Sequence, residues 1–232
     1  MATGRRRSFL RTALQCFQRQ TLDSAELIVI DDGAVPAEDL CAGLNRVVYV
    51  RLNQRMNLGE KLNIGIEKAR GELIQKLDDD DFYASNFLEK AVRPFVHGGA
   101  DRTKALVVWD CFLVLLMGSP PVRFSGHGWR AGGTFCFARG FGRGKLFRDV
   151  PRHVDWYFLH DHKPELIARC APESYMLVRH GKNTWSANEG GQPVDRMLGN
   201  LAPYSGSLRS IVGDAHFDFY NRLLTGSADL QW

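Results

Sequence analysis

The sequence predicts an α/β fold in which a mostly parallel central sheet is flanked by helices. Residues 26–30 form an apolar run without alternation, which indicates a strand buried on both faces. Residues 71–77 resemble a second short buried strand, entered through a glycine turn. Acidic clusters follow both runs directly, at 31–32 and 78–81. Because parallel strands end at one edge of a sheet, we expect the two clusters to converge there.

The first hundred residues alternate between helical and extended patterns. Ser8 is a candidate N-cap for a first helix, whose apolar residues recur up to Phe17. Strands are predicted over 26–30, 47–52 and 71–77, and further helices over 58–69 and 86–95. This order is typical of βα units that build a parallel sheet.

The remaining chain is less regular. Residues 105–117 predict one more strand, and after Pro120-Pro121 the sequence becomes rich in glycine, arginine and aromatic residues. Residues 201–232 carry apolar positions compatible with a packing helix. We expect a single domain over 1–232, in which the sequence pattern changes at about residues 100 and 200.

Composition excludes several classes of protein. The net charge of +4 over 232 residues does not predict a nucleic-acid surface, and the run Arg5–Arg7 is interpreted as a solvated helix entry. The longest apolar stretch, 105–117, is too short for a bilayer and contains Asp110, and no signal peptide is visible. We therefore expect a soluble, cytoplasmic protein.

The five cysteines are scattered along the chain without any Cys-x-x-Cys pair. An odd number of dispersed cysteines is explained most simply by reduced thiols in the cytosol. The sequence alone therefore predicts no disulfide framework.

Four consecutive aspartates, Asp78 to Asp81, include an Asp-x-Asp (DXD) pattern. Along an extended chain Asp78 and Asp80 would point the same way, toward one hard cation such as Mg²⁺ or Mn²⁺. The alternative is a solvated acidic turn. A calcium loop of the EF-hand type fits badly, because Tyr83 occupies the sixth position, where the loop needs glycine.

Taken in order, these segments resemble the family 2 glycosyltransferases of the GT-A fold. The resemblance is carried by Gln20-Thr21, by 26–33, by 63–66 with 69–72, and by 77–81, and it is looser over 132–185. It implies an inverting transferase that uses a nucleotide-sugar, most often a UDP-sugar, with Mn²⁺ or Mg²⁺. Residues 1–100 would form the nucleotide-binding half, 101–200 the acceptor half and 201–232 a helical tail.

The resemblance also implies roles for residues of the first half. Asp32 would bind the base of the nucleotide, and Asp80, with Asp78 or Asp79, would hold the metal and the diphosphate. Lys61 and Asn63 match a segment that lines the nucleotide pocket. The alternatives for these two are a surface lysine and an asparagine used in helix packing.

In the second half, Gly132 and Gly133 resemble a glycine-containing strand beside the sugar and acceptor subsites, where a plain bulge is the alternative. Asp155 matches the catalytic base, although Val154 stands where relatives usually have Glu, and a helix N-cap is the alternative. A base among aromatic residues would be partly desolvated, which raises its pKa. His180 matches a further metal ligand of some relatives, with an exposed loop histidine as the alternative.

The match fails at the start of the chain. The family's central first strand should precede Ser8, but residues 1–7 contain no apolar run. The strand is therefore expected to be missing or truncated, which would leave two unpaired edges inside the sheet. A wrongly assigned start or a fragment would explain this.

The sequence is compatible with two functions and offers less support for a third. The first is transfer from a nucleotide-sugar donor to a saccharide, a lipid-linked or another hydroxyl acceptor, with peripheral membrane association left open. The second is a degenerate, non-catalytic relative or fragment that binds a nucleotide or a partner. The third, a nucleotidyltransferase, lacks the glycine-rich basic signature expected near the N-terminus.

Overall fold

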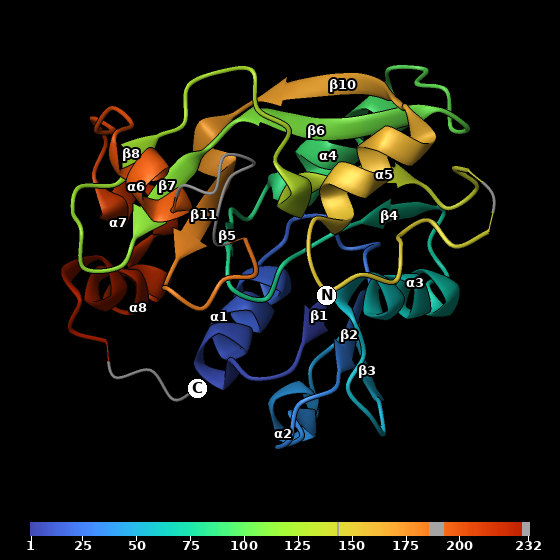
Figure 1. Ribbon diagram of the computed structural model, residues 1–232, viewed down its shortest axis with the longest axis horizontal. Helices are drawn as coiled ribbons and strands as arrows, with labels where there is room; N and C mark the ends of the chain where they lie inside the picture. The colour runs from blue at the N-terminus through green and yellow to red at the C-terminus, as the bar shows by residue number, and fades with distance from the viewer. Residues whose placement is uncertain (143, 186–192, 229–232) are drawn as a thin grey trace.

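The computed structural model describes residues 1–142, 144–185 and 193–228 (Figure 1). Its strands form three sheets, in the orders β1-β2-β3, β10-β6-β9-β4 and β5-β11-β7-β8. The strands are β1 Ala2–Thr3, β2 Leu27–Asp31, β3 Val47–Arg51, β4 Leu73–Gln75, β5 Phe82–Tyr83, β6 Ala105–Cys111, β7 Leu113–Leu116, β8 Arg123–Phe124, β9 Cys136–Ala138, β10 Glu165–Cys170 and β11 Tyr175–Arg179. The helices are α1 Arg7–Gln18, α2 Glu38–Cys41, α3 Leu58–Lys68, α4 Phe87–Val96, α5 Val154–His162, α6 Val194–Gly199, α7 Leu208–Val212 and α8 Asp214–Thr225, with short 3-10 turns at Gly132–Thr134 and Pro172–Ser174.

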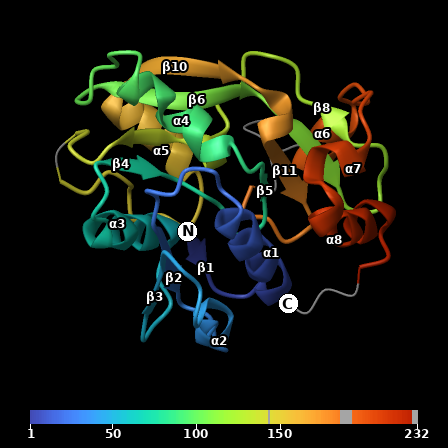
Figure 2. The same cartoon turned by 180° about the vertical axis from the view of Figure 1, so that it is seen from behind.

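Helices cover both faces of the sheet that contains β6. Figures 1 and 2 show α5 on one face and α4 on the other. The ring of Phe87 on α4 stacks on Trp109 of β6 with centroids 4.5 Å apart, and both side chains are fully buried. Aromatic stacking and apolar burial of this kind dominate the stability of a core.

The α/β prediction is confirmed, and the described strands form four parallel and four antiparallel pairings. Strands β2 and β3 pair in parallel with Leu27 opposite Val47, and every residue of β2 is buried, as its unbroken apolar pattern predicts. The first helix begins one residue before Ser8, with Arg6 at the N-cap, so the capping role predicted for Ser8 is wrong.

The strand predicted over 105–117 is in fact two strands. β6 pairs in parallel with β10 in one sheet, and β7 pairs in parallel with β11 in another. Phe112 separates them and exchanges hydrogen bonds with Ser125, whose hydroxyl accepts from the Phe112 amide at 2.9 Å. Both sheets bury this segment, so apolar residues continue on either side of Phe112 and the sequence pattern could not mark the break.

The first strand is present but truncated to two residues. Ala2 pairs with Ile30 of β2 and also forms a bridge with Asp78, while the Met1 ammonium donates to the Ile28 carbonyl at 2.8 Å. Beyond Met1, a cavity of about 730 Å³ lies between β2 and β4 and is lined by residues such as Ile74. β1 therefore links β2 to the first of the four aspartates, and the cavity lies farther along the same strands.

The C-terminal segment packs on the rest of the chain. Tyr220 and Leu223 of α8 are buried against β7 and β11 residues such as Leu115 and Met176. This agrees with the packing helix predicted for the tail. No helix within the described ranges has both the length and the apolar character needed to cross a membrane.

Candidate active site

One cavity of about 710 Å³ lies where the ends of β1, β2 and β4 meet the start of α5. Most of the site residues predicted from the sequence line this cavity. Those that line it are Asp32, Lys61, Asp78, Asp79, Asp80, Gly132, Gly133 and Asp155, whereas Asn63 and His180 lie outside its lining. The two acidic clusters therefore converge, as the strand-edge argument predicts.

Asp31 ends β2 and Asp32 follows it, but the two carboxylates serve different purposes. Asp31 accepts hydrogen bonds from the Gly33 amide at 2.7 Å and the Tyr49 hydroxyl at 2.6 Å. Burial alone would raise its pKa, but these hydrogen bonds and others lower it, so Asp31 builds the turn as an anion. Asp32 faces the cavity, where Lys61 Nζ lies 2.9 Å from its Oδ1.

Lys61 and Asn63 lie on α3 and point to different neighbours. Lys61 also donates to the Thr3 carbonyl at 3.1 Å, so it ties β1 to Asp32. Asn63 is buried and forms two hydrogen bonds with the backbone of Phe147, at 2.8 and 3.0 Å. These contacts favour the packing alternative for Asn63, and the nucleotide role of Lys61 remains a prediction.

The four aspartates do not alternate as an extended chain would. Residues 79–81 form a turn, and as a result Asp79 and Asp80 both reach the same guanidinium group, that of Arg6. Asp81 instead accepts from the Tyr175 hydroxyl at 2.6 Å and the Val178 amide at 2.9 Å, which anchors the turn to β11. Burial and the neighbouring carboxylates raise the pKa of Asp81 well above its ordinary value.

Arg6 is a site residue that sequence reasoning missed. Its guanidinium donates to Asp79 Oδ1 at 2.5 Å and to Asp80 Oδ2, so the interpretation of 5–7 as a solvated helix entry is wrong for Arg6. Burial opposes ionisation of Asp80, but the Arg6 charge and the His180 hydrogen bond lower the pKa of Asp80. The signal in the sequence was a basic residue at a helix start, which is too common to be specific.

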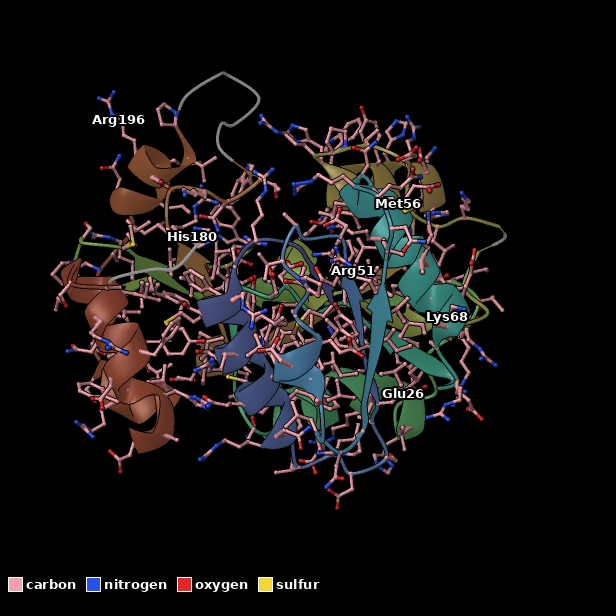
Figure 3. The ribbon with its side chains drawn as sticks, turned by 90° about the horizontal axis from the view of Figure 1, so that it is seen from below. Glu26, Arg51, Met56, Lys68, His180 and Arg196 are labelled. Atoms are coloured by element: carbon pink, nitrogen blue, oxygen red, sulfur yellow. The ribbon has the colours of Figure 1, made fainter. Side chains whose placement is uncertain are left out.

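His180 is buried, so the exposed-loop alternative is wrong. Its Nε2 lies 3.0 Å from Asp80 Oδ2, and the Lys182 amide donates to its Nδ1 at 3.3 Å. Because Nδ1 accepts, Nε2 carries the proton and donates to the carboxylate. Figure 3 shows His180 beside the start of α1, where its ring lies 4.6 Å from that of Phe9.

The three predicted metal ligands are not gathered around one point. Within the described ranges, Asp78, Asp80 and His180 do not form a group of ligand atoms that all lie within 4.8 Å of one another. Asp78 accepts two 2.8 Å contacts from Lys76, and Asp80 pairs with Arg6 and His180. Their role as metal ligands therefore remains a prediction.

Asp155 stands in the first turn of α5, and His153 takes the N-cap position, so the N-cap alternative is wrong for Asp155. Its Oδ1 is buried and has no hydrogen-bond partner among the described residues, while Lys76 Nζ lies 3.6 Å away. Burial raises the pKa of Asp155, and the Lys76 charge opposes that rise. His153 itself has a left-handed backbone, with φ 59°, which is uncommon for a non-glycine residue.

Gly132 and Gly133 begin a 3-10 turn before β9, so the strand predicted for them is wrong. The absence of a side chain at both positions is nevertheless necessary. A Cβ atom at Gly132 would lie 2.1 Å from Asp155 Oδ2, and one at Gly133 would lie 2.9 Å from Asp78 Oδ2. The two glycines therefore let the carboxylates approach the backbone on this side of the cavity.

Lys76 is the second site residue that sequence reasoning missed. It is buried and forms ion pairs with Asp78 and Asp155, which link the end of β4 to the start of α5. These carboxylates outweigh the effect of burial and raise the pKa of Lys76. A lysine inside an otherwise buried run was the available signal, because lysine is rarely buried without a partner.

Known proteins match part of the chain by sequence. Residues 1–108 match the family described as glycosyl transferase family 2. A protein of Bacillus subtilis (strain 168) that carries a glycosyltransferase name, EpsH, is 33% identical over 91 residues, which are 37% of this chain and 26% of the relative. The UDP-Gal:alpha-D-GlcNAc-diphosphoundecaprenol beta-1,3-galactosyltransferase of Escherichia coli is 31% identical over 86 residues, or 35% of this chain and 31% of the relative. The matched segments thus span about a third or less of these relatives.

The fold extends the likeness to most of the chain. The crystal structure of S. aureus TarS 1-349 in complex with UDP-GlcNAc superposes with a TM-score of 0.60 at 14% identity, covering 81% of this chain and 59% of that one. The same protein in complex with UDP gives a TM-score of 0.58 at 12% identity over 77% of this chain and 59% of that one. Identities this low show a shared fold only.

Proposed function

Because residues 1–108 belong to glycosyl transferase family 2, we propose that the protein transfers a sugar from a nucleotide-sugar to an acceptor hydroxyl. One observation carries the proposal: a single cavity joins Asp32 of the nucleotide-binding half to Asp155 on α5, with the aspartate turn between them. A donor bound along this cavity would have its base near Asp32 and its sugar near Asp155.

The donor is a UDP-sugar in this proposal. TarS was solved with UDP-GlcNAc and with UDP, and the E. coli relative is named for UDP-Gal, so the similar proteins support uridine. The Asp32 carboxylate, fixed by Lys61 and by the Met56 amide at 3.1 Å, is a preorganised acceptor for an N–H group of the base. Arg6 and Lys76 add positive charge on the side of the cavity where the diphosphate would lie.

The aspartate turn fits a Mn²⁺ or Mg²⁺ ion by its chemistry. Asp78 and Asp80 offer carboxylate oxygens, and two protein ligands suffice when water and diphosphate oxygens complete the coordination. Asp79 Oδ2 is buried and unpartnered among the described residues, so an acceptor in this turn is left over. The ion would stabilise negative charge on the departing nucleotide.

Asp155 is the general base of the proposed reaction. It removes the proton from the acceptor hydroxyl as that oxygen bonds to the anomeric carbon, while the bond from this carbon to the diphosphate oxygen breaks. Attack from the face opposite the leaving group inverts the anomeric centre. The raised pKa of Asp155 brings its basicity closer to neutral pH, which strengthens it as a base.

The acceptor side of the cavity is aromatic. Trp129, Trp156 and Trp185 line it, and the Trp156 side chain is half exposed. Indole rings bind the apolar faces of sugars, so the acceptor is a saccharide hydroxyl in this proposal, either free or lipid-linked. Trp156 also stacks on His160, with centroids 5.0 Å apart, which fixes the ring on α5.

A non-catalytic relative is the second candidate. It is favoured by the cationic partners that already neutralise Asp78 and Asp80. Such a protein would bind a nucleotide without turnover.

Calorimetry with UDP, GDP and ADP, each with Mn²⁺ and again with EDTA, tests both candidates. We expect UDP to bind in the presence of Mn²⁺ and to lose most of its affinity in EDTA. Release of UDP from UDP-sugars above background, with a saccharide acceptor, would exclude the non-catalytic candidate. Absence of nucleotide binding to a folded sample would contradict the proposed function.

A further inference from the structure

A second cluster of chemically active side chains lies outside the cavity. It comprises Asp110 and Cys111 at the end of β6, His127 in the loop after β8, and Cys170 at the end of β10. One ligand atom from each lies within 4.8 Å of every other. Among the described residues, no other set of three or more His, Cys, Asp or Glu side chains meets this condition.

The spacing of these atoms matches a tetrahedral metal site. Cys111 Sγ lies 3.4 Å from Cys170 Sγ, Cys170 Sγ lies 3.8 Å from His127 Nδ1, and His127 Nδ1 lies 3.5 Å from an Asp110 oxygen. With bonds of about 2.3 Å to sulfur and about 2.0 Å to nitrogen or oxygen, ligand atoms around a tetrahedral zinc ion are about 3.3–3.8 Å apart. The side chains could therefore bind an ion with only small movements.

A bulge in the sheet explains how neighbouring residues can both contribute. Arg169 pairs with Trp109, but the next residue, Cys170, pairs with Cys111, so Asp110 is the extra residue on β6. A bulge breaks the strict alternation of side chains, and Asp110 and Cys111 then reach the same side. The Trp129 amide donates to the Asp110 carbonyl at 2.9 Å, which holds the loop that carries His127 against this bulge.

One polar atom of the cluster has no partner in the absence of a cation. Asp110 Oδ1 is buried and has no hydrogen-bond partner among the described residues. Zinc binds cysteine as the thiolate and releases the thiol proton, so the two cysteines would supply the negative charge that the ion needs.

We propose that Asp110, Cys111, His127 and Cys170 bind one Zn²⁺ ion in a structural site of the Cys₂HisAsp type. All four coordination positions are filled by protein, so the site is closed, as structural zinc sites are. The ion fastens the loop between β8 and β9 to the ends of β6 and β10. Trp129 follows His127 in this loop and lines the candidate active-site cavity. Zinc would therefore fix one wall of that cavity.

The site is independent of the proposed sugar transfer and of the Mn²⁺ or Mg²⁺ ion. Soft thiolates favour zinc, whereas the aspartate turn offers only hard carboxylate oxygens beside His180. The competing outcome is a Cys111–Cys170 disulfide, since these residues pair directly across β6 and β10.

The test uses the full chain, purified with reductant and zinc and then dialysed free of unbound metal. We expect one zinc per chain by elemental analysis. Replacement by Co²⁺ is expected to give the intense visible bands of tetrahedral cobalt together with thiolate charge-transfer bands in the near ultraviolet. Binding is expected to release protons, measured by calorimetry in buffers of different ionisation enthalpy.

His127→Ala is the decisive variant, because His127 is exposed and its loss should not unfold the chain. We expect the zinc affinity of this variant to fall at least about tenfold and its cobalt bands to change. His97→Ala, at another exposed position, should keep the wild-type affinity and bands. Cys170→Ser should remove one thiolate from the charge-transfer bands. Zinc well below one per chain, equal affinity in the two histidine variants, or a reduced sample that retains a disulfide mass would each overturn the proposal.

Discussion

Lys76 Nζ lies 3.6 Å from Oδ1 of Asp155, and both atoms are shielded from water. The lysine follows β4 and the aspartate opens α5, so the pair joins two elements that are distant in sequence. Lys76 contacts Asp78 in the same way, at 2.8 Å. A buried ammonium between two carboxylates stabilises their anions, so Lys76 limits how far the pKa of Asp155 rises.

Lys76→Met should shift the pH dependence of transfer. Asp155 accepts a proton only when it is ionised, so the rate rises with pH through the pKa of Asp155. The positive charge of Lys76 lowers that pKa, and its removal raises the pKa further above the ordinary aspartate value. We therefore expect the acidic limb of the pH–rate profile to move to higher pH. An unmoved limb would show that Lys76 does not act on the base.

Asp155→Asn should abolish transfer and leave nucleotide binding intact. General-base catalysis contributes roughly 10²- to 10⁴-fold, so kcat is expected to fall by about that factor. UDP affinity, measured by calorimetry with Mn²⁺, should stay within about twofold because Asp155 lies at the sugar end of the cavity. Asp218→Asn, on the exposed face of α8, is the control. Loss of UDP binding in Asp155→Asn would undercut the assignment of Asp155 as base.

Gly132→Ala should reduce transfer through a steric effect. The new methyl group would lie 2.1 Å from Asp155 Oδ2, so the carboxylate or the turn must move. Because a misplacement of about 1 Å can cost 10²-fold in rate, we expect a loss of that order with UDP binding retained. Gly140→Ala is the matched control, since a Cβ atom there would have no heavy atom within 4 Å. Equal kinetics of the two variants would contradict the prediction.

Asn63→Ala should destabilise the fold without weakening UDP binding. The substitution removes both hydrogen bonds to Phe147 and leaves its buried N–H and C=O groups unsatisfied. Each unsatisfied group costs about 1–3 kcal/mol, so the free energy of unfolding is expected to fall by roughly 2–6 kcal/mol. Urea denaturation measures this, with the exposed Asn45→Ala as control. A stable variant with weakened UDP affinity would restore the nucleotide-binding interpretation of Asn63.

The sequence predicted much of the fold and most of the residues that line the cavity, for reasons that are local. The apolar run 26–30 and the acidic residues that follow each buried strand are set by side-chain period and strand ends, which are visible in one dimension. The split of 105–117 at Phe112 was invisible, because burial in two different sheets gives the same apolar pattern.

The cationic partners could not be predicted in the same way. Arg6 binds Asp79, which lies 73 residues away in the sequence. Lys76 pairs with Asp155 only because the fold brings the start of α5 close to the end of β4. The cluster of Asp110, Cys111, His127 and Cys170 depends on a bulge and a loop, and its cysteines looked unrelated in the sequence. Long-range pairings of this kind leave no periodic signal in a single chain.

The pairing of β1 has a mechanical consequence. Among the described strands, the bridge between Ala2 and Asp78 is the one pairing that joins the β1-β2-β3 sheet to the strands beyond it. Asp32 lies on one side of this bridge and Asp155 on the other, and side-chain packing makes the rest of the connection. A nucleotide-sugar that contacts both sides would add a further link between them, so hydrogen exchange in β2 should slow when UDP alone binds and slow further with the complete donor.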